Sequence, residues 1–347
     1  MKKEIEYINS LIKDYPRSTS QLNYPFHSDA EILKMPDGYL GVSVDAVSEE
    51  INLKLIHNPE TLGWMTVTAS ASDLAAIGLK TDKISILLKT SSETTEWKNL
   101  FKKGVDEAAR EYQIDEVEEV LTTGSETLSA CTAYGFSKTK PALSRVGLEE
   151  GDLLYLTGPI GWGNATALAN IAIRKMAPGI ADLIDTSYRP KARFKEAAFI
   201  SQFGQVCIDT SDGLLATLKW LEIFNHRKLK IDYSKKLFHP IALDVAEKTK
   251  VDPWLFLASQ NGEFELLFAV SGERSGSFEK SCQENGFSFL RIGSVEEGEG
   301  LALMIQGKEK TIVVDQLLDM LQEGVEPETY IKNMLGFAAV NGIKLEG

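Results

Sequence analysis

The sequence predicts a mixed fold of two halves, each built from alternating strands and helices, on three observations. The chain has 347 residues, enough for two domains with a hydrophobic core each. Short apolar runs of strand type alternate with amphipathic segments of helix type twice along the chain. Between the two sets, residues 145–152 form a polar link that contains glycine. We therefore expect an α/β half followed by a second half that also mixes helices and strands.

The composition narrows the classes of partner. The formal net charge is −13 and the pI is about 5.0, which argues against nucleic acid or an anionic membrane as the main partner. An anionic small substrate stays compatible, because metal ions can lie between carboxylates and phosphate oxygens. No apolar run approaches the roughly 20 residues of a membrane span. Residues 1–6 have no apolar stretch after their lysines, so we expect no secretory leader.

The three cysteines, Cys131, Cys207 and Cys282, lie far apart in the sequence. Their spacing matches neither a zinc-ligand pattern nor a disulfide framework. We therefore expect free thiols and a cytoplasmic location.

In the first half, the apolar periodicity predicts five strands and three helices. The strands are expected at 27–33, 39–45, 84–88, 119–123 and 131–136, and the helices at 1–15, 62–77 and 97–112. The turn signal at 36–38 separates the first two strands, and Thr61 is expected to cap the second helix. Asp29 and Asp45 are thus expected on neighbouring strands, in a register that the sequence leaves open.

A stretch of small residues at 70–78 surrounds one carboxylate, Asp73. Small residues let a backbone pack closely against another element. A carboxylate among them is unusual for a solvated helix face, so Asp73 is a candidate functional residue. The alternative is an exposed Asp73 whose neighbours enter the core.

The strand expected at 119–123 runs into a turn formed by Gly124, Ser125, Glu126 and Thr127. Such a turn offers backbone N–H groups to a phosphate and an oxygen to a metal ion. Many tight turns have the same composition, so a purely structural turn is the alternative.

In the second half, strands and helices alternate again. Strands are expected at 153–157, 206–209, 229–233 and 264–268, and helices at 165–175, 192–203, 214–224, 242–248, 277–285 and 315–322, with two short strands before the last helix. The glycines at 158–163 suggest a phosphate loop, although no Gly-Lys-Ser/Thr follows. A tight strand–helix turn is the alternative reading of these glycines.

Two carboxylates, Asp209 and Asp212, lie where a buried strand ends and a helix begins. Open α/β sheets place their ligand sites at such junctions. The alternative is a helix cap, in which Ser211 or Asp212 accepts from the first free N–H groups. Further along, Glu263 and Glu265 lie just ahead of and inside an apolar strand, and Glu265 should face solvent or a partner because unpaired burial is costly.

The order of these acidic motifs resembles a superfamily that includes aminoimidazole ribonucleotide synthetase, selenophosphate synthetase, hydrogenase maturation factor E and thiamine-monophosphate kinase. The resemblance covers about residues 26–300 and rests on the segments 62–64, 72–78, 151–161 and 209–214. The segment Gln260-Asn261-Gly262-Glu263-Phe264-Glu265-Leu266-Leu267-Phe268 is most similar to the Gly-Gly-Glu-Asp-Tyr-Glu-Leu-Leu-Phe segment of thiamine-monophosphate kinase.

The resemblance implies a two-domain PurM-like fold. An N-terminal α/β domain would bind ATP and form a homodimer, and a C-terminal α+β domain would close the site. The expected bounds are 1–148 for the first domain and 149–310 for the second, with a C-terminal helix and tail at 311–347 packing on the second. ATP and Mg²⁺ would lie in the cleft between the domains.

The resemblance also implies a role for each acidic motif. Metal ligands would be Asp29, Asp45, Asp73, Glu126 and Asp212, and the catalytic residues would be Asp209 and Asp212. ATP would be bound by Gly124, Ser125, Thr127, Arg145 and Ser211, and the acceptor by Asn52, Glu263 and Glu265. The rest of the acceptor pocket is expected in the loop at 17–26 and in the tail after Glu323.

Four positions depart from the family pattern. Ser28 stands where the family has an aspartate, and Asn52 stands where a histidine is expected. Glu126 and Glu263 replace aspartates, which keeps an oxygen ligand but moves it out by one methylene, a change to which Mg²⁺ is sensitive.

The leading expectation is ATP- and Mg²⁺-dependent phosphoryl transfer to a small phosphorylated metabolite, thiamine phosphate in the resembling enzyme. Two alternatives stay open. One is an ATP-dependent cyclo-ligase or amide-activating enzyme of the same superfamily, and the other is a degenerate, non-catalytic nucleotide-binding protein. In each case the expected partners are small molecules and a second copy of the chain, without nucleic acid or membrane.

Overall fold

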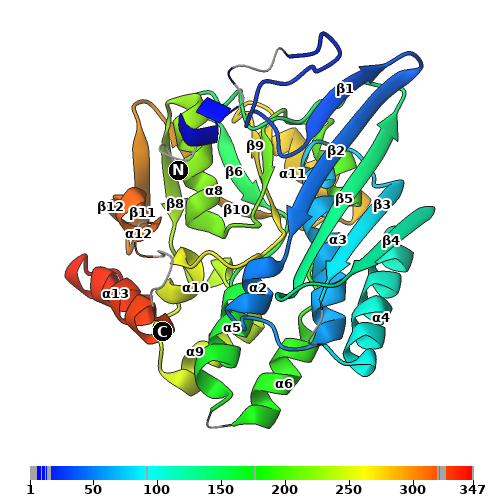
Figure 1. Cartoon of the computed structure of the whole chain (residues 1–347). Coiled ribbons are helices and arrows are strands. Elements are labelled where there is room, and N and C mark those ends of the chain that lie inside the picture. Colours follow the sequence, from blue (N-terminus) through cyan, green and yellow to red (C-terminus); the bar gives the residue numbers. More distant parts are fainter. Residues whose placement is uncertain are drawn as a thin grey trace.

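Two β-sheets, each with its own helices, make up the chain. The computed structural model describes residues 6–8, 10, 11, 13, 17–90, 93–175, 177–318, 320 and 326–345. Figure 1 shows the strands β1 to β5 on one side of the molecule and the strands β6 to β12 on the other. Among the described residues, no helix combines the length and the apolar character needed to cross a lipid bilayer.

The first sheet has five strands in the order β1-β2-β5-β3-β4. Its neighbours pair antiparallel except for β3 and β4, which run parallel. Buried and more exposed side chains alternate along β3 and β5, so one face of the sheet is covered and the other is open. The strands are β1 (Glu31–Met35), β2 (Gly38–Ala46), β3 (Lys83–Lys89), β4 (Glu116–Thr122) and β5 (Leu128–Ser137).

Helices α3 (Pro59–Ala76) and α4 (Thr95–Tyr112) lie side by side against this sheet (Figure 1). They approach closely because two glycines meet at their crossing. A Cβ on Gly63 would lie 2.0 Å from the Phe101 carbonyl oxygen, and a Cβ on Gly104 would lie 1.9 Å from the Glu60 carbonyl oxygen. The small residues further along α3 pack instead on β5, and Asp73 is carried on this same buried helix.

The second sheet has seven strands in the order β12-β11-β8-β10-β6-β9-β7. Its central strands are buried on both faces: Leu154 and Leu267 enter one core cluster, while Tyr155 and Phe268 enter another. This explains why these strands read as continuous apolar runs. The strands are β6 (Leu153–Leu156), β7 (Cys207–Asp209), β8 (Lys228–Asp232), β9 (Leu266–Val270), β10 (Leu290–Glu296), β11 (Gly300–Ile305) and β12 (Lys308–Ile312).

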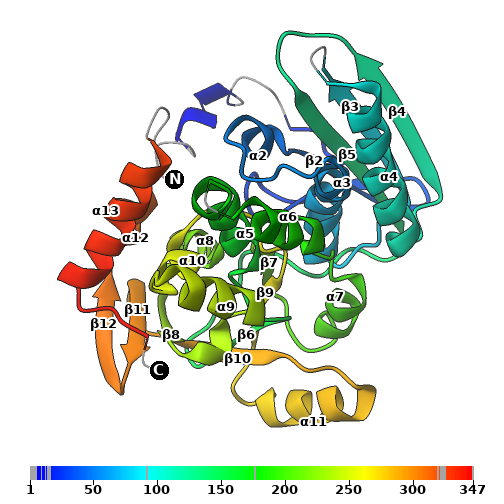
Figure 2. The same cartoon turned by 90° about the horizontal axis from the view of Figure 1, so that it is seen from below.

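The remaining helices surround the second sheet, apart from α2, which follows β2. Figure 2 shows α11 on one side of the second half and α13 on another, beside α12 and β12. These helices are α2 (Ser48–Asn52), α5 (Trp162–Leu168), α6 (Pro178–Ser187), α7 (Phe194–Ile200), α8 (Leu214–Asn225), α9 (Pro240–Thr249), α10 (Trp254–Ala258), α11 (Ser275–Asn285), α12 (Val314–Leu318) and α13 (Pro327–Val340). A π-helical turn (Ala169–Ile173) continues α5, and a 3₁₀ turn (Lys235–Leu237) precedes α9.

Several local expectations are corrected by the structure. Asn58, rather than Thr61, caps α3: its side chain accepts from the backbone N–H groups of Glu60 and Thr61, at 2.8 and 3.1 Å. Pro59 at the first helical position favours this earlier start. Helix α8 has Gly213, rather than Ser211 or Asp212, at its N-cap position.

Four helices, α2, α6, α10 and α13, are not among the elements expected from the sequence. They are short or irregular in their apolar spacing, and they are held by tertiary contacts such as the hydrogen bond from Trp254 Nε1 to the Met334 carbonyl at 3.2 Å. Of the helix expected at 1–15, residues 6–8, 10 and 11 are helical and most others lie outside the described residues. The helix expected at 315–322 is described for Val314–Leu318.

The two halves meet where α3 of the first contacts β7 of the second. Helix α3 and strand β7 are more than a hundred residues apart in sequence, and this contact brings them together. Both carry an aspartate at the contact, which defines the candidate site.

Candidate functional site

Three aspartates from three different elements converge between the two sheets. Asp29 lies just ahead of β1, Asp73 lies in α3, and Asp209 is the last residue of β7. One carboxylate oxygen from each lies within 4.8 Å of the others, which is a spacing that can hold a metal ion. Asp29 precedes β1 rather than lying on it as expected, but the register of β1 against β2 still places it near the end of β2, where Asp45 lies.

The acid cluster, defined here as Asp29, Asp73 and Asp209, leaves buried oxygens without a protein partner. Oδ2 of Asp29 and Oδ2 of Asp209 are buried and accept no hydrogen bond. The Asp29 side chain has no exposed surface, and Asp209 is 3% exposed. Unsatisfied buried carboxylate oxygens are costly, and hard oxygen donors are the ligands that Mg²⁺ prefers. The residues present therefore fit a divalent cation.

The raised pKa values of two carboxylates in the acid cluster also fit a bound divalent cation. Burial, and then the charges of Asp209, Asp45 and Asp29, raise the pKa of Asp73 well above its ordinary value. Burial and the nearby Asp29 raise the pKa of Asp209 to about 7. Close like charges in a buried site resist ionisation, and a bound cation would relieve this repulsion.

In metal-free solution, we expect the free energy of unfolding to fall as the pH rises from about 4 to about 7. Burial raises the pKa of Asp45 from 3.8 to about 6 and that of Asp209 from 3.8 to about 7. The folded chain therefore holds protons that the unfolded chain has lost. This stability is fully present below the ordinary pKa and is lost as the pH passes through the raised values. Urea denaturation midpoints in EDTA across this range measure the effect.

The control for this experiment is Asp209→Asn, which removes one of the titrating groups and should flatten the slope. Added Mg²⁺ should restore the midpoint of the unchanged protein at pH 8 and have little effect at pH 5. A midpoint that rises with pH in EDTA would contradict the arrangement described for the acid cluster.

Three side chains position the carboxylates of the acid cluster. Arg145 Nη2 donates to Asp29 Oδ1 at 2.8 Å, and Ser43 Oγ donates to Asp73 Oδ2. Ser211 Oγ donates to Asp209 Oδ1 at 2.9 Å. Arg145 and Ser211 were expected to bind ATP, but in this structure both are engaged with the carboxylates.

Two further predicted metal ligands, Asp45 and Asp212, lie close to the acid cluster. Burial raises the pKa of Asp45, and the charge of Asp212 adds to the effect. Asp45 Oδ1 accepts from the Ala46 N–H at 2.7 Å. A third neighbour, Glu50 in α2, was missed by sequence reasoning. Burial and then the charges of Asp45, Glu49 and Asp212 raise the pKa of Glu50 to about 7. The sequence signal for Glu50 is its position five residues after Asp45, in the short segment that follows the same strand.

Glu263 does not face an open acceptor site. Its carboxylate accepts from the backbone N–H groups of Trp162, Gly163 and Asn164 at 2.9, 3.4 and 3.3 Å, at the start of α5. The contact needs a glycine, because a Cβ on Gly163 would lie 1.8 Å from the Gly262 carbonyl oxygen. The N–H groups of the 158–163 loop that suggested a phosphate site are therefore occupied by a carboxylate of the chain itself.

Glu265 is buried and paired rather than facing solvent. It lies just before β9, accepts from Thr157 Oγ1 at 2.5 Å, and forms an ion pair with Arg193. Burial raises the pKa of Glu265, against the opposing effect of Arg193. No sequence pattern indicates Arg193 as the partner of Glu265, because the two residues are 72 positions apart.

The predicted phosphate turn lies on the loop between β4 and β5. Glu126 and Ser125 are exposed there, and Gly124 is partly buried. Thr127 is buried, with its hydroxyl 3.0 Å from Thr90 Oγ1. Glu126 is not among the three carboxylates that lie within metal-binding distance of one another. Asn52, expected to contact the acceptor, is exposed at the end of α2.

Comparison with known families supports the resemblance carried by the motifs. Residues 27–136 match the family described as AIR synthase related protein, N-terminal domain. The thiamine-monophosphate kinase of Buchnera aphidicola subsp. Schizaphis graminum is 25% identical over 319 residues, which cover 89% of this chain and 96% of that protein. The resemblance to this superfamily, predicted from the acidic motifs, is confirmed.

Solved structures confirm the fold class. AaThiL complexed with AMPPCP and TMP has a TM-score of 0.71 at 22% identity, covering 88% of this chain and 93% of that one. HypE of E. coli, a hydrogenase maturation protein, has a TM-score of 0.64 at 17% identity, covering 90% of this chain and 98% of that one. The PurM-like fold is thus shared across nearly the whole chain.

Proposed function

We propose that this chain transfers the terminal phosphoryl group of ATP to thiamine monophosphate and so forms thiamine diphosphate. The observation that carries the proposal is the acid cluster, whose three carboxylates come from three segments and lie within 4.8 Å of one another. Phosphoryl transfer requires positioning and charge neutralisation more than covalent chemistry. A relative of nearly the same length is named thiamine-monophosphate kinase, and a solved structure of this fold holds AMPPCP and TMP.

Asp29, Asp73 and Asp209 would hold Mg²⁺, with Asp45 and Asp212 beside them. When bound, Mg²⁺ neutralises phosphate charge and orients the transferring group. Asp209, which was expected to be a catalytic residue, is thus proposed as a metal ligand. Arg145 orients Asp29, since its guanidinium donates to the carboxylate in a buried site.

We also propose that the ATP phosphates contact the turn formed by Gly124, Ser125, Glu126 and Thr127. Ser125 and Glu126 are exposed on this loop, so the Ser125 hydroxyl is accessible to a nucleotide, whereas Thr127 is buried. A glutamate at position 126 could reach a second metal ion through its longer side chain. The acceptor, already ionised on its phosphate, needs no general base from the chain.

A homodimer formed through the open face of the first sheet is part of the proposal. Val44, Leu87 and Phe136 are 67, 38 and 58% exposed on β2, β3 and β5. Exposed apolar side chains on one sheet face favour a protein contact. Sedimentation of the chain as a monomer at micromolar concentration would contradict this part.

The buried free thiols of Cys131, Cys207 and Cys282 support a cytoplasmic location.

The test is ADP formation from ATP and Mg²⁺ with thiamine monophosphate, against a blank without acceptor. We expect ADP that depends on the acceptor, with thiamine diphosphate as the second product. Release of inorganic phosphate only with a nitrogen-bearing substrate would instead identify the cyclo-ligase alternative. No turnover together with nucleotide binding that is indifferent to Mg²⁺ would identify the non-catalytic alternative.

A further inference from the structure

Residues 185–194, the bridging segment, belong to the second half in sequence but pack in the core of the first half. Tyr188 and Ala192 are buried in the same hydrophobic cluster as the inner side chains of α3 and α4. Trp64 Nε1, in α3, donates to the Pro190 carbonyl at 2.6 Å. The bridging segment is therefore part of the first core, although the chain returns from it to the second sheet through α7 and β7.

The start of the bridging segment is fastened to the N-terminal end of α3. Asp185, 1% exposed, accepts from the backbone N–H groups of His57 and Asn58 at 2.8 and 2.9 Å. Arg189 Nη2 lies 3.0 Å from Glu60 Oε1 in the first turn of α3. These contacts hold the bridging segment in a fixed position relative to α3, the helix that contributes one carboxylate to the acid cluster.

The end of the bridging segment reaches the second sheet through an ion pair. Arg193 Nη2 pairs with Glu265 Oε1, and the two side chains are 26 and 9% exposed. The other Glu265 carboxylate oxygen accepts from Thr157 Oγ1 at 2.5 Å. A second contact lies beside this pair, where the Tyr188 hydroxyl donates to the Gly262 carbonyl. The residues just ahead of β9 are thus held from the side of the first half.

Glu265 lies opposite the turn that follows Asp209. The register of β7 against β9 pairs Asp209 with Leu266, which places Thr210 opposite Glu265. The Thr210 N–H and hydroxyl both donate to the Glu265 carbonyl at 2.9 Å, and the Glu265 N–H donates to Thr210 Oγ1 at 3.0 Å. Thr210 is fully buried, so water does not compete for these bonds. A shift of Glu265 therefore moves Thr210 and the neighbouring Asp209 with it.

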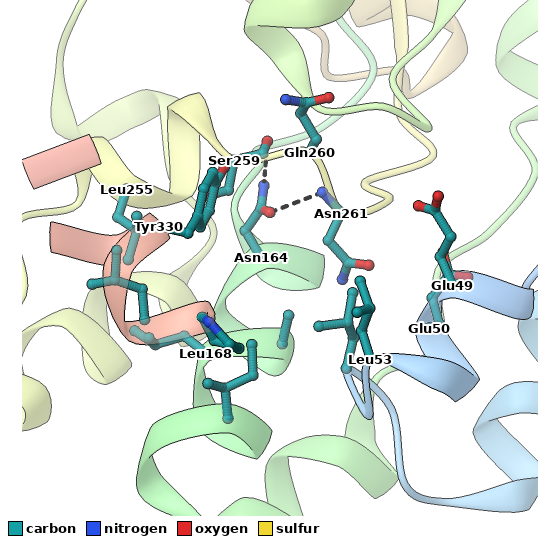
Figure 3. A pocket seen from close by; sticks show the side chains of 15 residues that line it. Glu49, Glu50, Leu53, Asn164, Leu168, Leu255, Ser259, Gln260, Asn261 and Tyr330 are labelled. Carbon is teal, nitrogen blue, oxygen red and sulfur yellow. Dashed lines mark hydrogen bonds between the residues drawn. The ribbon is translucent and has the colours of Figure 1, made fainter. Parts of the chain in front are cut away.

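The same turn is supported from within the second half by α5 and the loop before β9. A Cβ on Gly213 would lie 2.3 Å from the Ser259 carbonyl oxygen, so the turn rests directly on this backbone. Figure 3 shows how Asn164 of α5 holds the loop: Asn164 Nδ2 donates to the Ser259 carbonyl at 3.1 Å, and the Asn261 N–H donates to Asn164 Oδ1 at 3.0 Å. These contacts fix the turn to its own half, whereas the bridging segment ties it to the other half.

We propose that Arg193 is a positioning residue of the metal site. Its ion pair with Glu265 sets where Asp209 lies relative to Asp73. The bridging segment is fixed to the helix of Asp73, and Glu265 is fixed through Thr210 to Asp209. Mg²⁺ requires nearly ideal octahedral geometry, so the carboxylates must meet at a defined spacing. The proposal rests on the metal-binding role given to the acid cluster in the proposed function, and it adds the group that aligns the two sides of that site.

The test is calorimetric titration of the full chain with Mg²⁺ alone, without nucleotide. Arg193→Met should raise the Mg²⁺ dissociation constant about tenfold, a loss typical for groups that orient metal ligands. Arg193→Lys keeps a cation near Glu265 and should lose less affinity. The control is Arg189→Met, which removes an arginine of the same segment whose ion pair with Glu60 has a similar exposure, 20 and 17%. That pair does not contact the turn after Asp209, so the Mg²⁺ affinity should be unchanged.

A second variant separates positioning from support of the fold. Arg193→Met leaves Glu265 as an unpaired buried charge, which lowers the stability of the chain. Adding Glu265→Gln removes that charge, so the double variant should regain much of the thermal stability. The double variant still lacks the link to the bridging segment, so its Mg²⁺ affinity should stay about tenfold below that of the unchanged protein. A merely structural role would restore stability and affinity together.

Unchanged Mg²⁺ affinity in Arg193→Met, an equal loss in Arg189→Met, no Mg²⁺ binding by the unchanged protein, or recovery of Mg²⁺ affinity in the double variant would each overturn the proposal. If Arg193→Met does not fold, the double variant decides. ADP formation with thiamine monophosphate is measured separately. Mg²⁺ binding that depends on Arg193 but is not accompanied by turnover would refute the proposed function alone. Turnover with Mg²⁺ binding that is independent of Arg193 would refute this inference alone.

Discussion

Replacing Asp73 by Asn is expected to lower the rate of ADP formation by about a thousandfold or more while leaving the chain folded. Each tenfold loss corresponds to about 1.4 kcal/mol of barrier, and a metal ion contributes several kcal/mol to stabilising transferred charge. Asn keeps an oxygen that can accept from Ser43 Oγ, so the contact that orients the side chain is retained. The substitution therefore removes only the negative charge of the side chain at position 73.

The thermal stability of Asp73→Asn separates loss of function from loss of fold. In metal-free solution the variant should be at least as stable as the unchanged protein, because burial and then the charges of neighbouring carboxylates raise the pKa of Asp73, and Asn carries no charge to be buried or repelled. Mg²⁺ should no longer stabilise it to the same degree. The control is Asp106→Asn, an exposed partner of Lys102 on α4, which should keep full activity. Asp73→Asn with more than a tenth of the normal rate would refute the assignment of the acid cluster.

Replacing Arg145 by Met should lower the free energy of unfolding by about 3–5 kcal/mol in metal-free solution. The Arg145 and Asp29 side chains are 16 and 0% exposed and 2.8 Å apart, so the substitution leaves Asp29 as an uncompensated buried charge. Asp29 also lies beside two other carboxylates, which adds repulsion. Urea denaturation at pH 7 in EDTA measures the loss, and Mg²⁺ should restore part of it.

The matched control is Arg227→Met, which removes an arginine at a similar distance, 2.9 Å, from Glu149. Both side chains of that pair are more exposed, at 32 and 75%, and exposed pairs contribute about 0–1 kcal/mol. If Arg145→Met were no more destabilising than Arg227→Met, the ion pair with Asp29 would not be the structural support of the site. A loss of ATP affinity without a loss of stability would return Arg145 to the role of a nucleotide ligand.

Local elements and the acidic motifs could be predicted because their signals lie within a few residues. The strand–turn–helix sequence around Asp209 and the small-residue helix around Asp73 are visible as patterns of size and polarity. The motif order also indicated the superfamily and its fold, which the comparisons confirm. The start of α3 was misplaced by a few residues because Asn58 and Thr61 are both good caps, and only the observed hydrogen bonds distinguish them.

The alternating elements, the acidic character and the residues that could bind a metal ion can all be inferred from the sequence alone. The folded structure is needed to show which of these residues meet: Asp29, Asp73 and Asp209 do, whereas Glu126 remains on an exposed loop. The structure also shows that the Glu263 carboxylate accepts a hydrogen bond from the first N–H group of α5, and that Arg193 forms an ion pair with Glu265. The physical reason is that periodicity and capping act between near neighbours in sequence. Ion pairs and metal sites instead form between side chains that packing brings together from distant segments.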